Sequence, residues 1–170
     1  MPTYVLDFSS ITLDDLPRVG GKNASLGELF AALRPQGVGV LDGFATTADA
    51  YRRVLDTHGL RERLQAIFDG LDVEDLEQLQ RAGEAARAAV LETPLPDDVR
   101  EAVLGAYARL SERLGREPEM AVRSSATAED LPEASFAGAA ETFLNVRGRE
   151  GLLRAVHDCM SSLFTDRAIS

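Results

Sequence analysis

Apolar side chains recur at intervals of three and four residues over most of the chain, which is the spacing of helices that bury one face. The first such helix is predicted to begin after Gly21 and to end before Pro35. Its apolar stripe consists of Leu26, Leu29, Phe30 and Leu33. A second helix is expected after a cap at Thr46, with Asp49 three residues later. Further helices are predicted over residues 60–68, 73–91, 97–114 and 150–164.

Short apolar runs at 4–8, 38–44, 120–123 and 141–146 predict strands. The last two runs flank a long loop of small and acidic residues, whereas the helices predicted between 47 and 114 follow one another without a strand. The pattern therefore indicates an α+β fold: short strands that position a site, with a large helical insertion at about 47–114.

The composition narrows the choice of function. A chain of 170 residues with 45% hydrophobic content can bury one real core, so we expect one folded unit. The formal net charge of −10 opposes nucleic acid as a partner, since nucleic-acid binders usually carry a basic stripe. Cys159 is the only cysteine, which excludes a disulfide framework within the chain or a zinc cluster of cysteines. With no apolar run near the roughly 18 residues of a membrane span, a soluble cytoplasmic protein is expected.

The first candidate site is the sequence Gly20-Gly21-Lys22-Asn23 at the start of a helix. Small residues let the backbone approach a ligand, and the start of a helix favours anions. The sequence lacks the glycine spacing and the Ser or Thr after the lysine that a Walker A loop requires. On its own this segment is better described as a glycine turn before a helix with a solvated lysine.

The second candidate site begins where the strand at 120–123 delivers Arg123 to the long loop. Arg123 can bind a phosphate oxygen with two N–H groups, while Ser124, Ser125 and Thr127 can donate to others. The carboxylates of the same loop, Glu129, Asp130 and Glu133, would repel a triphosphate unless Mg²⁺ lay between, so we expect them to point outward. The simpler interpretation is a surface loop whose arginine pairs with a nearby acid.

Both histidines invite a phosphohistidine interpretation, but neither has a suitable context. His58 precedes Gly59 at a helix end, and His157 lies on a helix beside Asp158. We interpret both as structural or solvated residues, and Cys159 as an ordinary helix cysteine, because no catalytic or metal partner has suitable spacing.

Six motifs in order carry a resemblance to a known family. They are GGKNASLGEL (20–29), GFATT (43–47), AVRSSATAEDLP (121–132), ASFAG (134–138), ETFLNV (141–146) and SLFTDRAIS (162–170). Together they closely resemble the phosphoenolpyruvate synthase (pyruvate, water dikinase) family over essentially the whole chain. The resemblance implies the first part of an ATP-grasp-like nucleotide-binding domain that binds ATP with Mg²⁺. It also implies downstream partners, a domain with a phosphoacceptor histidine and a barrel that binds pyruvate.

The resemblance further implies roles for individual residues. Lys22 and Arg123 would hold ATP phosphates, Gly138 would let the backbone approach the nucleotide, and Thr142 would lie beside it. The family usually has Gln after this glycine, whereas Ala139 and Ala140 follow it in this chain, so the polar contact of that Gln with the nucleotide is not expected here. The implied reaction converts ATP, pyruvate and water to phosphoenolpyruvate, AMP and phosphate through a phosphohistidine relay.

The end of the chain, 164–170, stops in mid-pattern without the polar tail that usually closes a domain, which favours a fragment. No catalytic residue or metal ligand is expected within it, and the fragment alone should be inactive. Two alternatives remain open from the sequence. One is the ATP-binding region of a rifampicin phosphotransferase, which shares the same front and histidine relay. The other is a noncatalytic helical interaction module.

Overall fold

The computed structural model describes residues 2–72, 74–125 and 141–164. These ranges contain both helices and short strands, and the predicted α+β class is confirmed. The strands are β1 (Val5–Asp7), β2 (Phe44–Thr46), β3 (Met120–Arg123) and β4 (Thr142–Val146). The helices are α1 (Leu16–Val19), α2 (Gly21–Leu33), α3 (Ala48–Leu55), α4 (Leu60–Phe68), α5 (Leu76–Glu92), α6 (Asp97–Leu114) and α7 (Gly148–Ser161).

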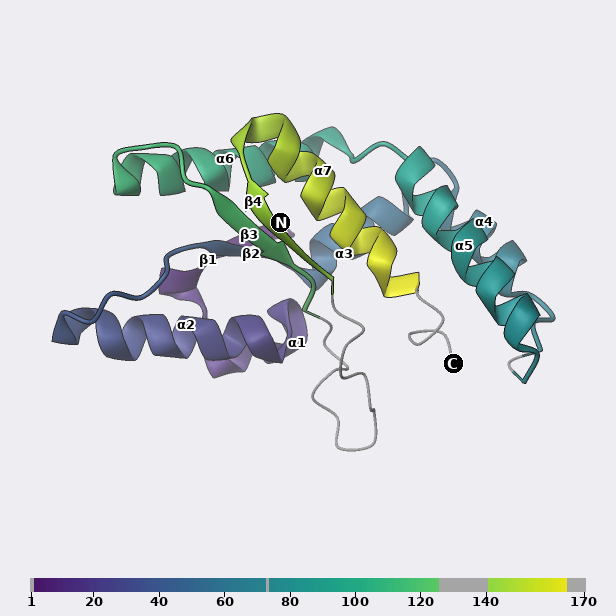
Figure 1. Ribbon diagram of the computed structural model, residues 1–170, viewed down its shortest axis with the longest axis horizontal. Helices are drawn as coiled ribbons and strands as arrows, with labels where there is room; N and C mark the ends of the chain where they lie inside the picture. The colour runs from purple at the N-terminus through teal and green to yellow at the C-terminus, as the bar shows by residue number, and fades with distance from the viewer. Residues whose placement is uncertain (1, 73, 126–140, 165–170) are drawn as a thin grey trace.

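The strands form two separate antiparallel ribbons, β1 with β2 and β3 with β4. In Figure 1 both ribbons lie in the middle of the molecule, with α6 above them, α2 below them and α7 running down to the right of the β3–β4 ribbon. Helices α4 and α5 stand together at the right of the same view, and the contacts between these two helices are extensive. No helix in the described ranges is both long and apolar enough to cross a membrane.

The main hydrophobic core lies between the helices α3, α4, α5, α6 and α7 and the inner faces of the two ribbons. Its fully buried members include Val54, Leu60, Val90, Val103 and Leu152, each at most 1% exposed. Burying a side chain of this size stabilises a fold by about 1.5–3 kcal/mol. The core therefore fixes the helices of 48–114 against α7 and, through α7, against β3 and β4.

A second, smaller core lies between α2 and the β1–β2 ribbon. It consists of Ile11, Val19, Ala24 and Ala45, with Leu6 and Phe8 packed against it. Helix α2 approaches this core closely because Gly27 has no side chain: a Cβ there would overlap the carbonyl oxygen and the Cβ of Ile11. The glycine thus sets how α2 lies against the ribbon.

The apolar stripe predicted for α2 is wrong in part. The buried residues of this helix are Ala24, Gly27 and Phe30, whereas Leu29 is 48% exposed. The large apolar residues of α2 predicted the wrong buried face. The helix packs with its small residues inward, because its backbone lies close to that of Ile11. The predicted stripe therefore shares only Phe30 with the buried face.

The helix ends follow the local chemistry of the chain. Helices α4 and α6 have the predicted bounds, and α6 is followed by Gly115, whose φ of 66° is the left-handed conformation that terminates helices. The cap predicted at Thr46 belongs to Thr47, whose hydroxyl accepts a hydrogen bond from the amide of Ala50. Helix α5 begins at Leu76, because the side chain of Asp75 accepts from the first amides of the helix.

The N-terminal part differs from the expected structure in two places. The strand predicted at 38–44 is wrong for most of its length, since residues 38–43 form no regular element and β2 is Phe44–Thr46. The short helix α1 was not expected. It begins with Pro17 in its first turn, where a proline costs no hydrogen bond.

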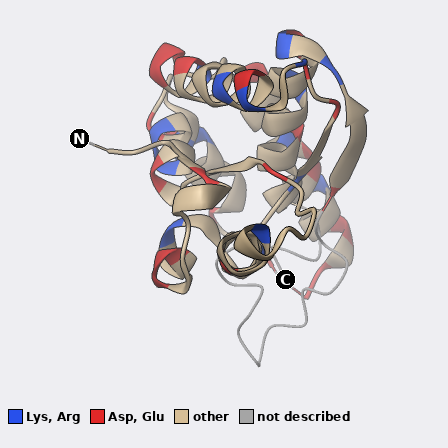
Figure 2. Ribbon diagram, turned by 90° about the vertical axis from the view of Figure 1, so that its left-hand side faces the viewer, with Lys and Arg blue, Asp and Glu red and all other residues tan. Residues whose placement is uncertain are grey.

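Charged side chains of opposite sign are interleaved along the helices, as Figure 2 shows. Several arginines pair with an acid three or four residues away on the same helix. These pairs include Arg52 with Asp49, Arg81 with Glu77, and Arg100 with Asp97. Much of the arginine charge is therefore balanced where it lies.

Candidate functional site

Lys22 lies in the first turn of α2, directly after a sharp change of chain direction. Gly20 separates α1 from α2 with a φ of 79°, a conformation that side chains rarely adopt. The Nδ2 group of Asn23 donates to the carbonyl oxygen of Val19 at 2.8 Å, which ties the two helices together. Lys22 itself is half-buried. The sequence Gly20 to Asn23 therefore offers a cation beside the amides of a helix start, where negative charge is favoured.

Arg123 and Thr142 are directly opposite each other in the β3–β4 ribbon. Successive side chains of a strand point to opposite faces, and the partly buried Met120 and Val122 face the main core. Arg123 therefore points to the other face, away from α7, and both Arg123 and Thr142 are exposed. The structure brings these two predicted site residues together on one open surface.

The two serines that follow Arg123 are less exposed than the arginine itself. The amide of Ser124 donates to the carbonyl oxygen of Glu141 at 3.3 Å, so the ribbon extends one residue beyond its last strand pair. Ser124 is buried, and the hydroxyl of Ser125 is a buried polar atom that has no hydrogen-bond partner among the described residues. Burying a hydroxyl without a hydrogen-bond partner costs free energy, so a ligand that formed a hydrogen bond with Ser125 would remove this cost. Thr127 and Gly138 lie outside the described residues.

Lys22 is 101 positions before Arg123 in the sequence, so a site that uses both residues requires the tertiary structure to bring them together. In the view of Figure 1, α2 begins at its right-hand end, next to α1. Strands β3 and β4 run down toward that part of the picture, where Arg123 ends β3 and Thr142 begins β4.

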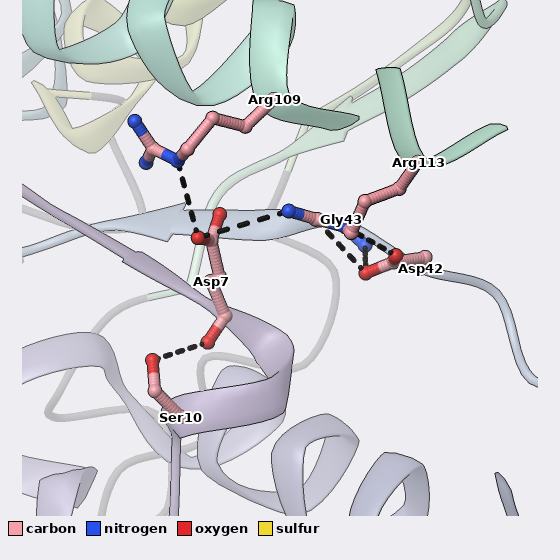
Figure 3. A network of polar contacts seen from close by, with 6 residues as sticks. All are labelled: Asp7, Ser10, Asp42, Gly43, Arg109 and Arg113. Carbon is pink, nitrogen blue, oxygen red and sulfur yellow. Dashed lines mark hydrogen bonds and ion pairs between the residues drawn. The ribbon is translucent and has the colours of Figure 1, made fainter. Parts of the chain in front are cut away.

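A polar cluster that the sequence did not reveal joins the first ribbon to α6 (Figure 3). Arg113 donates a hydrogen bond to the carboxylate of Asp42 at 2.9 Å and lies 3.8 Å from the carboxylate of Asp7. Asp7 also accepts a hydrogen bond from Arg109 at 3.4 Å. The hydrogen bond with Asp42 raises the pKa of Arg113 above its usual value, so the guanidinium stays charged. Each carboxylate here faces an arginine, so we assign the cluster a structural role as a clamp between β1, β2 and α6.

The two histidines and the cysteine lie in different surroundings. His157 forms a 2.8 Å hydrogen bond with the carbonyl oxygen of Val90, which joins α7 to α5. Burial raises the pKa of the Cys159 thiol to about 12, so the reactive thiolate is scarce at neutral pH. His58 is exposed in the connection between α3 and α4. Within the described ranges, no three His, Cys, Asp or Glu side chains are grouped so as to hold a metal ion.

A shallow hollow of about 470 Å³ runs between β4 and α7. It is lined by the whole of β4, from Thr142 to Val146, and by residues of α7 that include Arg154 and Asp158. Thr142 forms one end of the lining strand. The hollow adjoins the Arg123 and Thr142 pair without enclosing it.

Comparisons with known proteins agree on one family. The family described as pyruvate phosphate dikinase, AMP/ATP-binding domain, matches residues 16–170. Phosphoenolpyruvate synthase of Synechocystis sp. is 48% identical over 98% of this chain and 21% of its own length. Phosphoenolpyruvate synthase of Escherichia coli K12 is also 48% identical, over 98% of this chain and 21% of its own length. The enzyme of the same name from Aquifex aeolicus is 48% identical over 97% of this chain and 19% of its own length. The chain thus spans about a fifth of the length of these relatives.

Proposed function

The chain belongs to the family of the pyruvate phosphate dikinase AMP/ATP-binding domain, and from this premise we propose that it is the ATP-binding part of a phosphotransferase. The reaction proposed for the whole protein converts ATP, pyruvate and water to phosphoenolpyruvate, AMP and phosphate through a phosphohistidine relay. The relatives named above are phosphoenolpyruvate synthases, which supports this reaction.

The observation that carries the proposal is the register that pairs Arg123 with Thr142 on the exposed face of the β3–β4 ribbon. A guanidinium can donate two parallel N–H groups to a phosphate, and a threonine hydroxyl beside it can donate a third hydrogen bond. The buried hydroxyl of Ser125, two residues after Arg123, has no hydrogen-bond partner within the described part of the chain and supports the same assignment, because a phosphate oxygen would accept its hydrogen bond.

Lys22 supplies the second cation of the proposed site. Its ammonium group and the first amides of α2 would bind the same polyphosphate as Arg123, one from a helix start and one from a strand end. Ser124, Ser125 and Thr127 would satisfy further phosphate oxygens, and Gly138 would let the backbone approach the nucleotide. None of these groups reacts covalently. Their proposed work is to orient ATP and to balance the charge that develops during phosphoryl transfer.

The proposed architecture follows from the same premise. Residues 1–170 would be the N-terminal part of an ATP-grasp-like domain, in which about 47–114 is a helical insertion that carries α3 to α6. Downstream domains with a phosphoacceptor histidine and a pyruvate site would be its partners. The chain alone would then bind nucleotide without completing the reaction.

Mg²⁺ is proposed as the companion of ATP, since it bridges and neutralises phosphate oxygens in phosphoryl transfer. The described residues include no cluster of three candidate ligands for a metal ion. We therefore assign no residue of this chain to Mg²⁺ and derive no step through it.

Isothermal titration with Mg²⁺ and a nonhydrolysable ATP analogue tests the proposal. Saturable binding is expected, and Lys22→Ala and Arg123→Ala should each weaken it by roughly tenfold to a hundredfold, because a hydrogen bond to a charged group contributes about 1.5–3 kcal/mol. Arg116→Ala, at an exposed arginine just after α6, is the matched control and should bind as the unaltered chain does. In the full-length enzyme, each site variant should lower ATP-dependent turnover roughly a hundredfold.

Two results would redirect the assignment. A chain that shows no saturable heat is better described as a noncatalytic helical interaction module. A full-length protein that phosphorylates rifampicin and not pyruvate is a rifampicin phosphotransferase with the same ATP-binding front.

A further inference from the structure

Strand β4 contains one residue more than the segment of β3 that it pairs with. Met120 is opposite Val146, and Val122 is opposite Phe143, so two steps along β3 correspond to three steps along β4. Ala121 therefore faces both Leu144 and Asn145. This arrangement is a β-bulge, an extra residue that bends one strand and changes where its side chains point.

The backbone of Asn145 makes the bulge possible. Its φ of 58° is left-handed, and among the described residues His58 is the only other non-glycine residue with positive φ. Asparagine tolerates this conformation better than most side chains, whereas β-branched residues do not. The exposed Asn145 side chain makes no hydrogen bond within the described part of the chain. The residue thus contributes through its backbone conformation.

The bulge decides which way Thr142 points. Val146 packs against the main core, and in a regular strand every second residue before it, Leu144 and Thr142, would point inward as well. The extra residue reverses the alternation, so that Phe143 is partly buried and Thr142 is exposed opposite Arg123. Val146 can then remain in the core while Thr142 faces the proposed site.

We propose that Asn145 is a positioning residue, which holds the bulge that turns the Thr142 hydroxyl toward the nucleotide beside Arg123. This inference rests on the proposed ATP site and adds a residue that does not touch the ligand. The direction in which Thr142 points depends on the conformation of Asn145, three residues away, and glycine in place of Asn145 would preserve it.

The test compares Asn145→Gly with Asn145→Val, with His58→Val as the matched control. Both valine variants force a β-branched residue into a left-handed conformation, but His58 lies in the connection between α3 and α4. Three quantities are measured for each variant: the affinity for Mg²⁺ with a nonhydrolysable ATP analogue, the melting temperature, and the amide chemical shifts of Arg123 and Thr142 without nucleotide.

Asn145→Val should weaken nucleotide binding roughly tenfold and move both amide resonances, whereas Asn145→Gly should leave affinity and resonances close to their original values. His58→Val should lower the melting temperature without changing the affinity. The inference is overturned if Asn145→Val leaves the Arg123 and Thr142 resonances in place, or if it moves them while nucleotide affinity stays the same.

The amide shifts separate this inference from the proposed function. If the unaltered chain binds no nucleotide, the ATP site itself is refuted. The positioning role in that site then falls with it, and the shifts still report whether Asn145 controls the Arg123 and Thr142 pair.

Discussion

Asp98 receives polar contacts from two residues that are far away in the sequence. Arg53 of α3 donates to its Oδ2 at 2.9 Å, and the hydroxyl of Tyr4 donates at 3.3 Å. The hydrogen bond from Arg53 is the main reason why the pKa of Asp98 is lower than its usual value. Asp98 therefore connects the N-terminal segment and α3 to the start of α6.

This pair predicts how stability depends on pH. Because the folded-state pKa of Asp98 is depressed, its stabilising effect is present above the unfolded value near 3.8 and is lost as the pH falls through the folded value. Asp98→Asn should lower the melting temperature modestly at pH 7, and the difference should vanish in strong acid. Asp97→Asn, beside it in the same helix turn, is the control with a smaller effect. Thermal melts from pH 7 to pH 2 check this, and a pH-independent difference would contradict it.

At the same scale, the sequence could predict which residues form the proposed site but not their geometry. The motifs around Lys22 and Arg123 identify candidate phosphate ligands from residue type alone. Thr142 is the strand partner of Arg123 because of the β-bulge at Asn145. An asparagine within an apolar strand does not by itself predict a left-handed backbone. The Asp7, Asp42 and Arg113 cluster was likewise missed, because its members lie far apart in the sequence.

At the scale of elements, the packing of α2 against Ile11 yields a prediction. Gly27→Ala should destabilise the protein by about 1–3 kcal/mol through overpacking, although alanine favours helices more than glycine does. Gly105→Ala is the matched control in α6, because a Cβ there meets only the flexible end of Arg109, at 3.5 Å. That variant should be neutral or more stable, by up to about 1 kcal/mol.

Denaturant unfolding of the two glycine variants measures both effects. Equal stability changes would show that α2 does not approach Ile11 closely. A selective loss in Gly27→Ala supports the close approach that sets the position of α2, and with it the position of Lys22 at the start of that helix.

Element boundaries were predictable where the chain carries explicit stop signals. Pro96 before α6 and Gly115 after it define that helix, and Gly59 precedes α4. The strand predicted at 38–44 had apolar residues but no partner for most of its length, since only Phe44–Thr46 pairs with β1. Pairing is a tertiary event, so local pattern could not decide it.

At the scale of the whole molecule, two cores hold the parts of the proposed site. The smaller core around Ile11 supports α2 and therefore Lys22, whereas the main core supports the β3–β4 ribbon and therefore Arg123. Sequence composition predicted a single folded unit but could not show this division. The clamp of Asp7 and Asp42 with Arg113 joins the first ribbon to α6, and so connects the two regions.

Lys22 is the only lysine of the chain, and the other 17 of its 18 cationic Lys and Arg side chains are arginine. An amine-selective reagent therefore reports on one side chain, with the amino terminus as an internal reference. The measurement that tests the central claim is the rate at which Lys22 is modified, with and without Mg²⁺ and an ATP analogue, in the unaltered chain and in Arg123→Ala. If both cations bind one polyphosphate, the nucleotide should protect Lys22, and Arg123→Ala should remove that protection at the same nucleotide concentration. Equal modification of Lys22 with and without nucleotide, or equal protection in both proteins, would contradict the account.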